Sequence, residues 1–119
     1  MFEGVMWEDS WLLGWRHEDN RLIFTVEASL WPGHPAYEAP RPGEWTCYKR
    51  GRLVFEAVRS VDGLPGSEGG TPPYADASGE RDFGSIDHFS AAEGGYRLGL
   101  DFADVLVQCE TVRLEFDSA

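Results

Sequence analysis

The sequence predicts a single all-β domain, either an antiparallel β-sandwich or an open barrel of about five to seven strands. Three observations support this prediction. Apolar and polar residues alternate with a period of two in several segments, clusters of turn-forming residues separate those segments, and no helical period extends beyond about two turns. The chain has 119 residues, of which 42% are hydrophobic, which is enough for one packed core. We therefore treat residues 1–119 as one domain.

The first two strands are predicted to form a hairpin. Residues 21–31 alternate most clearly, with apolar side chains on one parity and polar side chains on the other, as in a strand with one buried face. The apolar segment 11–16 precedes them across a polar turn at residues 17–20. We expect a short helical turn at residues 2–7, and we expect Asp9 and Ser10 to cap a helix or to stabilise the turn into the first strand.

Proline and glycine residues interrupt the strand pattern in the middle of the chain. Residues 32–43 are expected to be irregular, because proline lacks the backbone donor that a strand needs. Residues 44–61 favour strand again, and Gly51 marks either a bend in one long strand or a hairpin turn. The Gly- and Pro-rich stretch 62–82 has too few large apolar residues to order itself, so we predict a long, mobile loop.

The C-terminal third is predicted to be strand throughout, interrupted by turns. Residues 83–89 and 96–102 alternate on either side of a glycine turn at 93–95, and residues 101–104 are expected to turn the chain again. In the last run, the apolar residues from Val105 to Cys109 have one parity and those from Val112 to Phe116 have the other. A β-bulge near residue 110 would keep both sets facing the core.

The charge balance excludes some classes of partner. Ten Lys and Arg residues against 21 Asp and Glu residues give a formal net charge of −11. Nucleic-acid binding depends on basic side chains that neutralise phosphates, and anionic membranes attract basic segments. We therefore expect neither nucleic acid nor membrane as a partner. An acidic surface permits a basic protein partner, whose encounter it would accelerate.

The sequence indicates a cytoplasmic protein. Its N-terminus lacks the basic and apolar regions of a signal peptide, and no apolar run approaches the ~20 residues of a membrane-spanning helix. Cys47 and Cys109 each lie inside an apolar, strand-like run instead of in a short-spaced pair. We expect both to be buried thiols, as is usual in a reducing compartment.

No pattern in the sequence indicates catalysis. His17 and His88 have acidic neighbours, but adjacent residues on a strand point to opposite faces and no metal-binding spacing is present. We expect His17 in the polar hairpin turn and His88 at an exposed strand position. None of the serines lies in a nucleophile-elbow motif. We therefore expect no metal, no cofactor and no enzymatic activity.

Aromatic residues give the strongest indication of a binding surface. Five Trp residues exceed the usual need of a core of this size. Trp31 has the parity opposite to Leu22 and Leu30, so it should project outward, and Tyr37 and Trp45 lie near the same Pro-rich connection. Aromatic residues commonly anchor interfaces. The predicted binding residues, including two nearby acidic side chains, are Trp31, Tyr37, Trp45, Glu8 and Asp9.

Four short sequence elements, spread over most of the chain, resemble elements of a known class of proteins. They are an acidic Asp-Ser-aromatic-Leu element at residues 9–12, a hairpin, a Leu-Val-Phe-Glu strand at 53–56 and a terminal Val-Arg-Leu-Glu-Phe strand. Together they resemble small bacterial all-β proteins of unassigned function, some of which are immunity proteins of polymorphic toxin systems. The resemblance implies a cytoplasmic protein whose acidic surface covers a toxin, often a basic nuclease.

Three functions remain open from the sequence. The first is a non-enzymatic module that binds another protein, such as an immunity-type inhibitor of a basic toxin. The second is a small-ligand or carbohydrate-binding protein, or a weak hydrolase, that uses Trp31, Trp45 and Tyr37 as a stacking platform. The third is a homo-oligomer formed through an exposed sheet face or edge, because edge strands must be covered or blunted.

Overall fold

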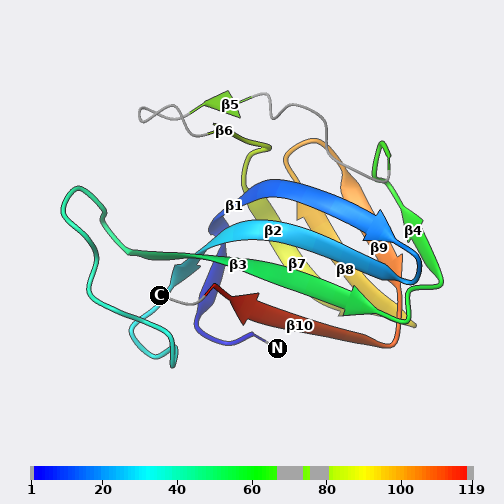
Figure 1. The fold of residues 1–119 in the computed structure, drawn as a ribbon, viewed down its shortest axis with the longest axis horizontal. Helices are drawn as coiled ribbons and strands as arrows, with labels where there is room; N and C mark the ends of the chain where they lie inside the picture. Colours follow the sequence, from blue (N-terminus) through cyan, green and yellow to red (C-terminus); the bar gives the residue numbers. More distant parts are fainter. Residues whose placement is uncertain (1, 67–73, 76–80, 118–119) are drawn as a thin grey trace.

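Two four-stranded antiparallel sheets form the fold, with the strand orders β1-β2-β3-β10 and β4-β9-β8-β7. Figure 1 shows one sheet in front of the other and a small two-stranded sheet beside them. The computed structural model describes residues 2–66, 74–75 and 81–117. The strands are β1 (Val5–Glu18), β2 (Arg21–Leu30), β3 (Cys47–Glu56), β4 (Ser60–Asp62), β5 (Tyr74–Ala75), β6 (Arg81–Asp82), β7 (Ile86–Ala92), β8 (Gly95–Leu100), β9 (Asp104–Gln108) and β10 (Thr111–Phe116).

The fold class predicted from the sequence is confirmed. The two sheets face each other as in a β-sandwich and do not close into a barrel. The described residues contain more strands than the five to seven expected, because β4, β5 and β6 are only two or three residues long. Such short strands leave too little alternation to be recognised in a sequence.

The predicted first hairpin is present. Strands β1 and β2 pair from Val5 opposite Leu30 to Glu18 opposite Arg21, and Asp19 turns the chain with φ at 51°. The helical turn expected at residues 2–7 is wrong, because β1 already begins at Val5 and its backbone pairs with the end of β2. Strand pairing supplies the backbone partners that an isolated helical turn this short lacks. His17 consequently lies on β1 and not in the turn.

Gly51 lies inside one continuous strand. Strand β3 runs without a break from Cys47 to Glu56, so the hairpin alternative is wrong. Gly51 pairs with Val26 on one side and Phe116 on the other. A Cβ atom at this position would lie 2.5 Å from the carbonyl oxygen of Glu115. The glycine therefore permits the close approach of β10 to β3.

The last apolar run contains two strands in different sheets. Strand β9 pairs with β8 and β4, whereas β10 pairs with β3. The parity change occurs near residue 110 as expected, but a single bulged strand is wrong. The chain crosses from one sheet to the facing sheet at residues 109–110, and each strand turns its apolar face toward the shared core from the opposite side.

The two Gly- and Pro-rich stretches differ. Residues 31–46 contain no strand, which confirms the irregular connection predicted for 32–43. Within the stretch 62–82, β5 pairs with β6 through Tyr74 opposite Asp82. The part of this stretch that the structure describes is therefore not wholly loop. Residues 67–73 and 76–80 of the predicted mobile loop lie outside the described residues.

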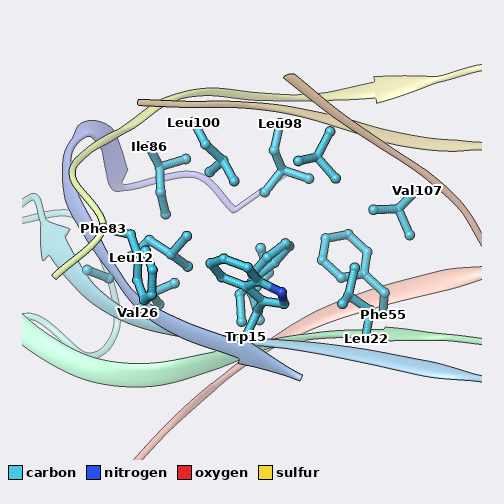
Figure 2. Packing of buried hydrophobic residues seen from close by; sticks show 14 of the residues in the cluster. Leu12, Trp15, Leu22, Val26, Phe55, Phe83, Ile86, Leu98, Leu100 and Val107 are labelled. Carbon is cyan, nitrogen blue, oxygen red and sulfur yellow. The ribbon is translucent and has the colours of Figure 1, made fainter. Parts of the chain in front are cut away.

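The core fills the space between the sheets. Figure 2 shows side chains such as Trp15, Leu22 and Phe55 facing Leu98 and Val107 of the other sheet. Leu22, Phe55, Leu98 and Val107 are fully buried. Full burial of an aliphatic or aromatic side chain contributes about 1.5–3 kcal/mol. Packing across this layer therefore holds the two sheets together.

Cys47 and Cys109 are free, buried thiols, as the sequence predicts. Burial raises the pKa of the Cys109 thiol, and the nearby Arg59 charge opposes this effect. A thiol with a raised pKa is a weak nucleophile at neutral pH. This environment gives Cys109 a packing role.

Candidate functional site

A large irregularity in β1 shapes the end of the sandwich near the N-terminus. Met6 pairs with Ser29, but the next paired residue of β1, Trp11, lies opposite Glu27. The residues between Met6 and Trp11 thus form an outward bulge from β2. A bulge bends its strand and redirects its side chains. Beyond it, the backbone N–H of Leu12 donates to the carbonyl of Gly84 at 3.0 Å, which ties β1 to the segment that precedes β7.

Ser10 holds the bulge in place. Its side chain is fully buried, and its Oγ donates to the carbonyl oxygen of Met6 at 2.7 Å. The same Oγ accepts a hydrogen bond from the backbone N–H of Ser29 at 3.0 Å. The hydroxyl therefore takes the place of the β1 backbone group that the bulge has displaced. The cap expected at Asp9 and Ser10 is corrected accordingly, because both residues lie within β1.

An open pocket lies between the bulge and β7. Its volume is about 390 Å³. Aromatic walls come from Trp7 and Phe89, whose rings are 5.3 Å apart, and from Trp31, which is 54% exposed. Trp31 is anchored by its backbone N–H, which donates to Gly4 at 2.8 Å. The full lining is Gly4, Val5, Met6, Trp7, Glu8, Trp31, Asp87, His88 and Phe89.

The charged groups of this pocket are acidic. Glu8 is exposed and Asp87 lies across the pocket, and neither has an ion-pair partner within the described parts of the chain. The Ser85 hydroxyl donates to Asp87 at 3.1 Å. No Lys or Arg lines the pocket. An aromatic face beside carboxylates is a suitable site for a cationic group, through charge attraction and cation–π contact.

His88 forms one wall of the pocket and is exposed, as the sequence predicts. Its ring covers Gly99 of the neighbouring strand, where a Cβ atom would lie 2.2 Å from the His88 Cε1 atom. A register shift between Ile86 and His88 places Asp87 and His88 both at the surface. Gly99 thus permits the histidine to lie against the sheet.

A second group of side chains joins the bulge to β3. The hydroxyl of Tyr48 donates to the Asp9 carboxylate at 3.0 Å. Burial raises the pKa of Tyr48, and the hydrogen bond and negative charge of Asp9 raise it further. The indole N–H groups of Trp45 and Trp11 beside the Tyr48 side chain lower this pKa and so oppose the effect. Asp9 therefore acts here as a structural acceptor.

The five predicted binding residues fall into three places. Glu8 and Trp31 line the pocket, whereas Asp9 and Trp45 contact Tyr48. Glu8 and Asp9 separate because neighbouring residues of an extended chain point to opposite sides. Tyr37 is half-buried and packs against the core.

Trp31 and Trp45 are exposed, as expected, but no stacked platform of the three aromatic residues is present among the described residues. In the described part of the chain, no ring contact joins any two of Trp31, Tyr37 and Trp45.

Sequence reasoning missed Asp87, His88 and Phe89 as pocket residues. They lie far along the chain from Glu8 and Trp31, and only the packing of β7 beside β1 brings them together. The adjacent Asp87 and His88 were a visible signal, but nothing in the sequence indicates which strand they face. Tyr48 was missed because a lone tyrosine in a strand carries no functional signal.

The described residues contain no cluster of three or more His, Cys, Asp or Glu side chains that would hold a metal ion. They also contain no helix long and apolar enough to cross a bilayer. Comparisons with protein-family models, curated proteins and solved structures found no match. The geometry of the pocket is therefore the main basis for a functional proposal.

Proposed function

We propose that this chain is a non-enzymatic binding module that takes a basic side chain of a partner protein into the pocket between the β1 bulge and β7. One observation carries the proposal: exposed Trp31 shares an open pocket with Glu8 and Asp87, and neither Lys nor Arg lines it. A Lys or Arg side chain from a partner would supply the missing positive charge. Burial of its stem against Trp31 would add apolar contact.

The overall charge supports the same kind of partner. A formal net charge of −11 attracts a basic protein over long range and speeds encounter, and the pocket then fixes the orientation. Cation–π contact at an exposed site contributes about 0.5–1 kcal/mol. The pocket is thus expected to give specificity, with further contacts supplying affinity. An immunity-type inhibitor of a basic toxin is one protein of this kind.

A selection experiment tests this function without knowledge of the partner. A random peptide library displayed on phage is selected on the immobilised protein, and bound peptides are then retested on Trp31→Ala and on the double variant E8Q/D87N. We expect enrichment of peptides that contain Arg or Lys and loss of their binding to both variants. Trp45→Ala serves as the matched control, because this tryptophan is also exposed but lies outside the pocket.

Two results would contradict the proposal. One is enrichment of peptides that lack basic residues. The other is binding of basic peptides that persists unchanged in Trp31→Ala and E8Q/D87N, since this would indicate attraction to the general negative charge and not to the pocket.

A further inference from the structure

Strand β10 is a regular edge strand of the sandwich, and within the described residues one of its two sides has no partner strand. One of its sides pairs with β3 over its whole length, from Thr111 opposite Glu56 to Phe116 opposite Gly51. No backbone hydrogen bond from another described segment reaches its other side. The strand contains neither Pro nor Gly, its pairing with β3 has no bulge, and its charged side chains do not point inward, so three of the usual features that block edge pairing are absent.

The other edges of the two sheets are less suitable for pairing. Strand β1 contains the bulge, and its Leu12 bonds to Gly84 in the segment that precedes β7. Strand β4 has only three residues. Strand β7 has a register shift at Asp87 and borders β1, with Trp11 bridged to Ser85. Within the described residues, β10 is thus the longest edge strand without an irregularity or a covering segment.

The hydrogen-bond pattern of β10 determines which residues face outward along the edge. The N–H of Asp117 donates to the carbonyl of Arg50 at 3.1 Å, so the odd-numbered residues direct their backbone groups toward β3. Val112, Leu114 and Phe116 therefore direct their N–H and C=O groups to the free side. Their side chains are half-buried and pack against the core.

We infer that two copies of this chain pair through antiparallel β10 strands, with the two-fold axis at Leu114. This register places Leu114 opposite its own copy and Val112 opposite Phe116, so all outward backbone groups find partners. It also places Arg113 of each copy opposite Glu115 of the other. The result is a continuous eight-stranded sheet built from two four-stranded ones.

Charge selects this register over its neighbours. Moving the axis to Arg113 sets two arginines opposite each other, and moving it to Glu115 sets two glutamates opposite each other. Like charges directly across a strand pair are destabilising. Within one chain, Arg113 already bonds Glu115 at 2.9 Å and pairs with Glu56, so pairing would extend an existing ionic network. This inference does not depend on the proposed pocket.

Sedimentation equilibrium of the full chain over a concentration series tests the inference. Moderate ionic strength is required, because salt screens the repulsion between two chains that each carry −11. We expect the mass to rise from 13.3 kDa toward twice that value. Arg113→Glu alone and Glu115→Arg alone should each remain monomeric, because each sets like charges opposite each other.

An equimolar mixture of Arg113→Glu and Glu115→Arg gives the sharpest result. In the mixed pair, both facing positions again have opposite charges, so the mixture should form dimers although each variant alone does not. Circular dichroism controls for folding, and if Arg113→Glu does not fold, Glu115→Arg alone retains its prediction. A wild-type chain that stays monomeric overturns the inference, as does a dimer that both substitutions leave intact.

Discussion

Removal of the buried Ser10 hydroxyl should destabilise the fold, because this hydroxyl bonds to backbone groups of both β1 and β2. In Ser10→Ala, the N–H of Ser29 and the carbonyl of Met6 both lose their partner. A buried donor left without a partner costs about 1–3 kcal/mol, and the net loss of a further hydrogen bond costs about 0.5–1.5 kcal/mol. We therefore expect the free energy of unfolding to fall by about 2–4 kcal/mol.

Urea denaturation followed by tryptophan fluorescence measures this loss, with the slope of the transition checked for two-state behaviour. Ser29→Ala is the matched control. The Ser29 hydroxyl is buried and has no hydrogen-bond partner among the described residues, so its removal should leave stability unchanged or raise it by up to about 1 kcal/mol. A loss below about 0.5 kcal/mol in Ser10→Ala would refute the role of Ser10 in the bulge.

Three further substitutions test other parts of the structure. Gly51→Ala should cost about 1–3 kcal/mol, because its Cβ would lie against the Glu115 carbonyl, whereas Gly14→Ala, which has free space, should be nearly neutral by urea denaturation. Tyr48→Phe should reduce the loss of stability above pH 10. The pKa of Tyr48 is raised from 10.0 in the folded state, so the wild-type protein loses stability as the pH rises from 10.0 through this raised pKa. An unchanged profile in pH-dependent melting would contradict this. Gly99→Ala should displace the His88 ring and shift its imidazole resonances in NMR spectra, and unmoved resonances would contradict the contact.

The sequence predicts a strand correctly where one face of the strand is buried and the other is exposed to solvent. Strand β2 is predicted because Leu22, Phe24 and Val26 share one parity and most residues of the other parity are polar, and the structure buries these three side chains fully. The sequence does not decide between a bend and a hairpin turn at Gly51, because a glycine gives the same local pattern in a turn and at a point where a neighbouring strand approaches the backbone closely. The parity change near residue 110 was located, but its cause is a crossing between sheets, which depends on partners elsewhere in the chain.

The candidate site was predictable only in part. Outward projection of Trp31 followed from its parity, and the structure confirms its exposure. Glu8 reaches the pocket from the bulge of β1, which Ser10 holds through its hydrogen bonds to Met6 and Ser29. A serine after an aspartate is a typical helix-cap pattern, so the sequence favours a cap there. Tertiary hydrogen bonds override that local preference.

The most direct test of the proposed pocket is an NMR titration of the ¹⁵N-labelled protein with a short blocked peptide that has one Arg flanked by Gly, and with its citrulline counterpart. We expect shifts confined to residues 4–8, the Trp31 indole and residues 87–89, which weaken strongly with citrulline and disappear in Trp31→Ala. Shifts located elsewhere, or equal shifts with both peptides, would contradict the account that this pocket binds a basic side chain.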